Sequence, residues 1–313
     1  MNGTAKAIGR ARYPLLSKLS DYGELMKPEL TGLSVLTSLC GFYLASSGPF
    51  HYILFVHLAL GTALLGGGAG ALNQFIEREY DSLMKRTERR PLPAGRLEPS
   101  ECLTFGIVIA AAGMLELTLF VNILTGFLAA VTFATYIFLY TPLKRITPYS
   151  TLVGAIPGAL PPVMGWTAAR NSIGTEAAVL FAILFCWQMP HFLSLAWMYR
   201  RDYARAGFKI LTVDDPGGRR TSRQILAYSI GLVPVSLAPA FAGMTGLMSV
   251  TGAAMLSLGF LSIGVLLARQ SRRSPAGIHA ADPVEFNFYS RRMFFASLVY
   301  LPCLMLLLTI DKV

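Results

Sequence analysis

Three oxygen-bearing side chains recur at every fourth position of one segment. Asn73, Glu77 and Asp81 follow this spacing, and a helix with 3.6 residues per turn places them on one stripe about 80° wide. Amide and carboxylate oxygens suit a hard cation such as Mg²⁺, which usually binds through one or two carboxylates and the phosphates of a substrate. The spacing therefore indicates a metal site for a diphosphate substrate. On spacing alone, the alternative is a solvated helix end whose acids pair with Arg78 and Lys85.

The elements that must position this stripe are apolar. Of the 313 residues, 54% are hydrophobic and 14% are charged, whereas soluble domains carry about 25% charged residues. The apolar residues form runs close to the ~20 residues that a membrane-spanning helix needs. The sequence therefore predicts an all-α polytopic membrane protein with about nine transmembrane helices. The predicted spans are 31–48, 52–72, 102–120, 122–140, 150–166, 175–198, 224–243, 246–268 and 293–310.

The basic residues predict how these helices are oriented. With nine spans, every Lys and Arg except Arg170 and Lys312 falls in the N-terminal segment or in loops on the same side of the membrane. Basic residues are retained on the cytoplasmic side during insertion, so we expect the N-terminus and the candidate site on that side. The net charge of +10 is interpreted as topology and contact with lipid headgroups. No nucleic-acid partner is expected, because no nucleic-acid-binding module is present.

The chain contains no linker that would divide it into separate soluble domains. We expect residues 1–30 to form a cytoplasmic N-terminal segment and residues 31–313 to form a single transmembrane domain. Acids, bases and turn formers gather in two loops, at about 73–100 and 199–223. The glycine run 66–70 lies inside a predicted helix, which favours close helix packing over a phosphate cradle.

The residues after the stripe complete a longer signature. Met84, Arg86, Thr87, Arg90, Pro91, Leu92, Pro93 and Gly95 extend it to NxxxExxxDxxMxRTxxRPLPxG. This string resembles the first signature of the UbiA prenyltransferases, in the form found in heme O synthases. The resemblance covers about residues 21–311 and implies helices around a central cavity, with Asn73, Glu77 and Asp81 holding Mg²⁺ and an isoprenoid diphosphate. Arg86 and Arg90 would contact the diphosphate, because the guanidinium fork matches phosphate oxygens.

A second match follows the predicted span 175–198. Residues 187–192 read WQMPHF and residues 200–207 read RRDYARAG. Quinone-type members of the family typically have DxxxD here, whereas Ala206 replaces the second aspartate in this chain. The strings QxPHF and DYxxAG resemble the heme O synthase form. By this resemblance, Asp202 would complete the metal and diphosphate site from the opposite side.

The segment YTPLKR at 140–145 resembles a third signature of the family. The resemblance implies that Tyr140 and Lys144 donate to the diphosphate and that Arg145 also binds it. The alternative is an interfacial tyrosine with basic side chains that extend toward the headgroups. The Gly- and Pro-rich stretch 154–162 also matches the family, and interrupted membrane helices of this kind usually line a cavity.

Two histidines are candidate contacts for a heme. His191 follows Pro190 inside one apolar run, and His57 lies in the middle of another. A histidine at membrane depth is a functional candidate, and imidazole is a common axial ligand of heme iron. For His191 the alternative is a neutral ring bonded to a backbone carbonyl.

The resemblance implies a specific reaction and its partners. A farnesyl group would pass from farnesyl diphosphate to a vinyl group of heme B, which gives heme O and diphosphate, with Mg²⁺ as the cofactor. Further partners would be membrane lipid and heme A synthase or the assembly of a terminal oxidase. The expected location is a bacterial inner membrane, and the alternative is the mitochondrial inner membrane. The catalytic residues implied are Asn73, Glu77, Asp81, Asp202, Lys144 and Tyr140.

Other functions remain as alternatives. A UbiA-type enzyme that prenylates an aromatic or quinone precursor is the nearest, and Ala206 argues against it. A transporter would place charged residues near the centres of its spans, whereas here they cluster at one face. A heme-delivery factor without catalysis would not need the candidate Mg²⁺ ligands, yet all of them are present.

Overall fold

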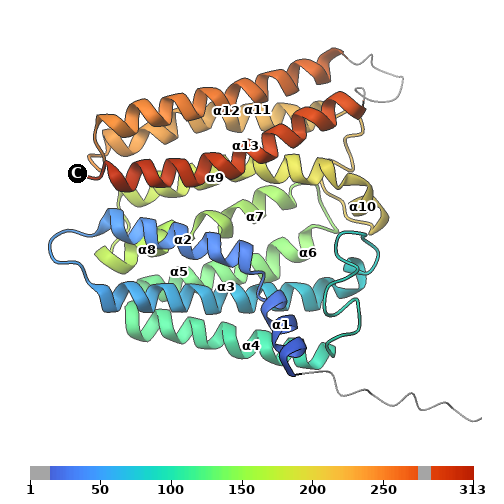
Figure 1. Ribbon diagram of the computed structural model, residues 1–313, viewed down its shortest axis with the longest axis horizontal. Coiled ribbons are helices and arrows are strands. Elements are labelled where there is room, and N and C mark those ends of the chain that lie inside the picture. The colour runs from blue at the N-terminus through green and yellow to red at the C-terminus, as the bar shows by residue number, and fades with distance from the viewer. Residues whose placement is uncertain (1–14, 274–282) are drawn as a thin grey trace, which may run out of the picture.

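The computed structural model describes residues 15–273 and 283–313, and these residues are largely helical (Figure 1). The helices are α1 (Leu15–Leu25), α2 (Pro28–Ala45), α3 (Tyr52–Asp81), α4 (Pro99–Glu116), α5 (Ile123–Ala134), α6 (Thr141–Leu143), α7 (Ser150–Ala159), α8 (Pro161–Arg170), α9 (Thr175–Met198), α10 (Arg200–Arg205), α11 (Arg219–Phe241), α12 (Leu247–Arg273) and α13 (Pro283–Ile310). Two π-helical segments, η1 (Leu117–Val121) and η2 (Thr135–Tyr140), continue α4 and α5. The first 14 residues of the predicted N-terminal segment lie outside the described residues.

Eight helical segments within the described ranges are long and apolar enough to cross a membrane. They are Tyr52–Asp81, Pro99–Val121, Ile123–Leu143, Ser150–Arg170, Thr175–Met198, Arg219–Phe241, Leu247–Ser271 and Glu285–Ile310. Each matches a predicted span, and the all-α membrane fold is confirmed. The remaining predicted span, 31–48, falls on α2. This helix has 18 residues and is not among the eight, because Pro28 and Glu29 make its first turn polar.

Helix α9 lies at the centre of the bundle (Figure 1). It packs against α7 and α8 and also against α11 and α13, while α12 packs against both α11 and α13. The indole of Trp187 in α9 donates to the backbone carbonyl of Ser297 in α13 at 2.9 Å. Side chains such as Leu180 and Ile183 are fully buried along α9, so this helix joins the two halves of the bundle through one continuous core.

Glycines allow α2 and α8 to approach each other closely. A Cβ atom on Gly41 would lie 2.1 Å from the carbonyl oxygen of Pro162, and one on Gly165 would lie 1.8 Å from that of Ser38. The glycine run of α3 has the same role, since a Cβ atom on Gly68 would lie 2.6 Å from the backbone nitrogen of Ala110. The predicted packing role of that run is therefore confirmed at Gly68. Small residues of this kind are how membrane helices come into close contact.

The end of α3 that carries Asp81 is held by α1 and by the loop at 82–98. Arg96 from the loop donates to Asp21 at 2.8 Å and to Glu24 at 2.6 Å, both in α1. Gln74 of α3 donates to the backbone carbonyls of Glu24 and Leu25 at 3.2 Å each. These contacts lie at the same end of the bundle as α6 and α10 (Figure 1). The predicted N-terminal segment thus contains a helix that packs on the candidate site.

The seam between α2 and α8 is expected to tolerate no added side chain. Gly165→Ala should lower the free energy of unfolding by about 1–3 kcal/mol, because the new methyl group overlaps the backbone of α2. Thermal unfolding followed by circular dichroism in detergent measures this. Gly32→Ala in α2 is the matched control, since nothing lies within 4 Å of its added Cβ. If both variants unfold at the same temperature as the unmodified protein, the close approach of α2 and α8 is refuted.

Candidate functional site

The three oxygen donors predicted from their spacing are buried at the C-terminal end of α3. Asn73, Glu77 and Asp81 are 1%, 7% and 1% exposed, respectively. Their burial contradicts the alternative of a solvated helix end. Buried carboxylates require opposite charges or hydrogen-bond donors, so the neighbouring side chains decide whether this stripe is stable.

Each of the three donors faces a cation that a different element supplies. The contacts are Lys27 Nζ to Asn73 Oδ1 at 2.5 Å, Lys144 Nζ to Glu77 Oε1 at 2.7 Å, and Arg90 Nη1 to Asp81 Oδ2 at 2.7 Å. We call these six residues the ionic row. A row of oxygen donors thus lies opposite a row of cations.

Local structure positions each cation of the ionic row. Lys27 joins α1 to α2 in the left-handed region, with φ 49° and ψ 63°, a conformation that non-glycine residues rarely adopt. Arg90 lies in the loop at 82–98, which is tied to α3 where Thr87 Oγ1 donates to the carbonyl of Asp81 at 2.9 Å. Lys144 follows α6, and its carbonyl accepts from the amide of Lys209 at 2.8 Å.

Two residues at the site were not predicted to belong to it. Besides the contact from Lys27, Asn73 donates through Nδ2 to Thr141 Oγ1 at 3.1 Å, and that hydroxyl donates to the carbonyl of Tyr136 at 2.8 Å. Both contacts orient the amide of Asn73. The sequence offers little signal for either residue, because Lys27 is one of many basic residues at the membrane boundary and Thr141 carries no charge.

The pKa values of the two lysines in the ionic row are shifted in opposite directions. Burial lowers the pKa of Lys27 to about 7, and the nearby charges of Arg90 and Lys144 act in the same direction. Burial also acts to lower the pKa of Lys144, but the Glu77 carboxylate raises it, and the net result is a pKa above the usual lysine value. Glu77 thus favours the charged form of Lys144, while burial disfavours the charged form of Lys27.

The α3 donors fit a hard cation that a substrate helps to hold. Oδ1 of Asp81 is buried and has no hydrogen-bond partner, so one carboxylate oxygen is available as a ligand. All donors in the stripe are oxygens, which Mg²⁺ prefers. Within the described ranges, no group of three or more His, Cys, Asp or Glu side chains is arranged to hold a metal by itself. The residues therefore fit Mg²⁺ only in the company of further ligands, such as diphosphate oxygens.

Asp202 is not part of the ionic row. It lies in α10, accepts from Arg205 Nη2 at 3.0 Å, and forms no metal-binding group with Glu77 and Asp81. The loop at 82–98 nevertheless reaches α10, because Arg86 Nη2 donates to the hydroxyl of Tyr203 at 3.3 Å. Arg86 thus contacts α10, and the Asp202 carboxylate pairs with Arg205 of its own helix.

Arg145 and Tyr140 flank Lys144 on either side. Arg145 donates to the hydroxyl of Tyr80 at 2.6 Å and lies over its ring. The ring of Tyr140 lies 4.4 Å from Lys144 Nζ. Tyr140 thus contacts the lysine that pairs with Glu77, and the ring of Tyr80 contacts Arg145.

A mostly apolar cavity adjoins the ionic row at Lys27. Its open space is about 1000 Å³, part of which connects to the surroundings. Lys27 and Tyr140 line the polar end, while Thr62, Leu65 and Met164 line the other end. Its walls come from α2, α3, α5, η2, α7, α8 and α9. The span 150–170 is interrupted at Leu160, and the residues on both sides of the interruption line the cavity, as the Gly- and Pro-rich stretch predicted.

The two histidines lie in different places. His191 Nδ1 is 2.7 Å from Ser297 Oγ, so its partner is a hydroxyl and not the backbone carbonyl considered above. The next residue, Phe192, lines the cavity. His57 Nδ1 is 2.6 Å from Glu116 Oε1 and precedes Asp81 by 24 residues of the same helix, about 36 Å along its axis. The structure does not bring His57 to the site.

Comparisons with known proteins agree with this geometry. Residues 34–307 match the model of the UbiA prenyltransferase family. A protein of Solibacter usitatus named protoheme IX farnesyltransferase is 44% identical over 94% of this chain and 99% of its own length. A protein of Salinibacter ruber with the same name is 41% identical over 94% of this chain and 99% of its own length.

Solved structures share the fold at low identity. A digeranylgeranylglyceryl phosphate synthase structure has a TM-score of 0.76 at 14% identity and covers 94% of this chain and 98% of that one. A UbiA homologue from Archaeoglobus fulgidus bound to DMAPP and Mg²⁺ has a TM-score of 0.64 at 14% identity, over 90% of this chain and 99% of that one. The chain belongs to the UbiA prenyltransferase family and is an integral membrane protein.

The α3 stripe is expected to bind the donor diphosphate together with Mg²⁺. Asp81→Asn should weaken the binding of a prenyl diphosphate in Mg²⁺ at least tenfold, or about 1.4 kcal/mol, because the amide removes the charge that a metal requires. Isothermal titration calorimetry with and without Mg²⁺ measures this. Glu79→Gln is the matched control, since this side chain lies on α3 but is 77% exposed. Equal affinity of the two variants would rule out the stripe as the metal site.

Proposed function

We propose that this chain transfers a farnesyl group from farnesyl diphosphate to a vinyl group of heme B, giving heme O and diphosphate. The observation that carries the proposal is the similarity, over nearly the whole chain, to relatives named protoheme IX farnesyltransferase. The ionic row beside an apolar cavity supports the donor half of the reaction. Such a site suits a molecule with a diphosphate at one end and a hydrocarbon chain at the other.

The ionic row would stabilise the leaving diphosphate. An allylic diphosphate ionises when the charge that develops on its oxygens is stabilised by fixed donors. Lys144 and Arg90 would exchange part of their contact with Glu77 and Asp81 for phosphate oxygens, and Arg86 and Arg145 lie at the edges of the same site. When bound, Mg²⁺ would be held by Asn73, Glu77 and Asp81 and would supply further positive charge there. Asp202 is the proposed donor from the opposite side, and it would have to leave Arg205.

The walls of the cavity would protect the reacting carbon. The bond between C1 of the farnesyl group and the diphosphate oxygen breaks, and C1 then bonds to the terminal vinyl carbon. Water adds to the neighbouring carbon and releases a proton, which gives the hydroxyethylfarnesyl group. The rings of Tyr136 and Tyr140, which line the cavity, would stabilise the allylic cation through their faces and exclude water until the carbon–carbon bond has formed.

His191 is the proposed contact for the heme. Its ring is stacked on Trp187, with the ring centroids 5.1 Å apart. Its Nδ1 atom is hydrogen-bonded to the hydroxyl of Ser297. Nε2 is then the nitrogen left for heme iron. The distribution of basic residues supports the proposal that the ionic row lies on the cytoplasmic side, and the bacterial relatives support a bacterial inner membrane. Heme A synthase or the assembly of a terminal oxidase is the proposed recipient of heme O.

The proposal is tested by reconstituting the reaction. Purified protein in detergent is incubated with heme B, farnesyl diphosphate and Mg²⁺, and heme O is detected by chromatography with mass spectrometry. Heme O should form, and it should fall to background with EDTA or with Asp81→Ala. Glu79→Gln serves as the matched variant that should retain activity.

Two other outcomes would overturn this assignment of the acceptor. If 4-hydroxybenzoate or a naphthoate is prenylated and heme B is not, the acceptor is an aromatic or quinone precursor. If heme B binds but no acceptor is prenylated, the chain carries heme without catalysis.

The heme contact makes a separate prediction. His191→Gln should weaken the binding of heme B at least tenfold and shift its Soret band, because an axial nitrogen is removed. His57→Gln is the control and should leave both unchanged, since His57 lies at the opposite end of α3. Difference spectroscopy during heme titration measures both quantities. A Soret band that is identical in all three proteins would exclude His191 as an axial ligand.

A further inference from the structure

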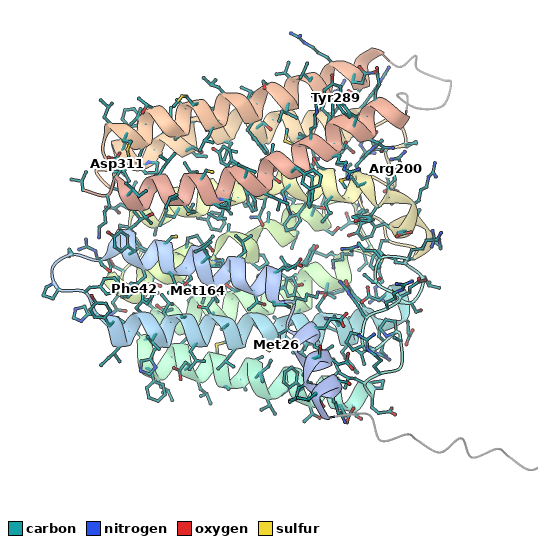
Figure 2. The ribbon with its side chains drawn as sticks, viewed as in Figure 1. Met26, Phe42, Met164, Arg200, Tyr289 and Asp311 are labelled. Atoms are coloured by element: carbon teal, nitrogen blue, oxygen red, sulfur yellow. The ribbon has the colours of Figure 1, made fainter. Side chains whose placement is uncertain are left out.

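The cavity has a closed end, and one side chain lies across it. Met164 lines the cavity and is only 1% exposed, so nearly all of its side chain is packed against protein. In Figure 2 it lies between the end of the bundle marked by Asp311 and the end marked by Arg200. Thr132 Oγ1, which donates to the carbonyl of Leu128 at 2.8 Å, also lies 3.8 Å from the sulfur of Met164. The methionine is therefore held in place from α5.

The helix that carries Met164 is packed tightly against α2. The next residue, Gly165, is the one whose added Cβ would lie 1.8 Å from the carbonyl of Ser38. On the other side, Pro162 contacts Gly41 with similar closeness. Backbone seals the seam between α2 and α8 at this level, and backbone cannot rotate away as a side chain can. An unbranched methionine is the adaptable part of this closed end.

The length of the cavity can be compared with that of a prenyl chain. Thr62 at the closed end precedes Asn73 at the polar end by eleven residues of α3, which is about 16 Å at the helical rise. An extended isoprene unit contributes four main-chain bonds. The three backbone bonds of one extended amino-acid residue span about 3.5 Å. At the same length per bond, three isoprene units span roughly 14 Å and four isoprene units span roughly 19 Å. Three units fit within this length, and four do not.

We propose that Met164 determines the length of the prenyl chain that this protein accepts, by closing the far end of the cavity. The inference rests on the proposed binding of an allylic diphosphate at the ionic row, which directs the hydrocarbon chain toward Met164. Geranyl and farnesyl chains end before the methionine. A geranylgeranyl chain reaches it and has to displace it against the sealed seam.

Donor binding tests the inference without the acceptor. Dissociation constants for geranyl, farnesyl and geranylgeranyl diphosphate are measured in Mg²⁺ by calorimetry, with no heme present. The unmodified protein should bind farnesyl diphosphate at least tenfold more tightly than geranylgeranyl diphosphate. In Met164→Ala this ratio should fall at least tenfold, and Met164→Val should lie between the two. A heme O assay with the same proteins then reports on the acceptor independently.

Two controls separate cavity length from other effects of substitution. Met164→Leu keeps the volume and should keep the ratio within twofold. Met255→Ala makes the same change in α12 at a side chain that is 71% exposed and does not line the cavity, and it should also leave the ratio unchanged. Should the alanine variant fail to fold, the valine variant and the ratio in the unmodified protein still decide. Equal affinity of the unmodified protein for the C15 and C20 donors would overturn the inference, as would an unchanged ratio in the valine variant.

Discussion

The pairing of buried oxygen donors with cations at the end of α3 is the constraint on which the rest of the structure depends. Glu77 and Asp81 are almost inaccessible, and loss of one partner from a buried ion pair costs roughly 3–5 kcal/mol because the other charge is left uncompensated. The partners come from the turn before α2, the loop after α3 and the turn after α6. Three separate connections must therefore meet at one helix end, and the contacts of Arg96 with α1 hold one of them there.

The same constraint explains why the charges and the cavity are adjacent but distinct. Charged groups are costly in the hydrocarbon region of a membrane, and the ionic row lies at the C-terminal end of α3, next to the loop at 82–98. Below it, α3 presents small residues to the cavity, and close helix contacts at Gly68 and Gly165 seal its surroundings. The result is a polar end for a diphosphate and an apolar, closed space for a hydrocarbon. This division of one substrate between two environments is consistent with a prenyltransferase.

The sequence alone was sufficient for the fold and for placing three oxygen donors on one face of a helix. Span length and composition are local properties, so the membrane helices could be located without knowing their neighbours, except that α2 is less apolar than the others. The four-residue spacing of Asn73, Glu77 and Asp81 determined that they share one face, because helix geometry is the same in every protein. The interruption near Leu160 was also indicated, since proline and glycine act on their own backbone.

Only the tertiary structure decided which residues from other elements join that face. Lys27 and Thr141 reach Asn73 across 46 and 68 residues of chain, respectively, and no local pattern specifies such contacts. Asp202 pairs with Arg205, and His57 pairs with Glu116 far from the site, although their residue types suit metal and heme. A side chain's chemistry is set by its type, whereas its partners are set by how the helices pack. That packing depends on shape complementarity summed over the whole bundle, which spacing along one segment does not contain.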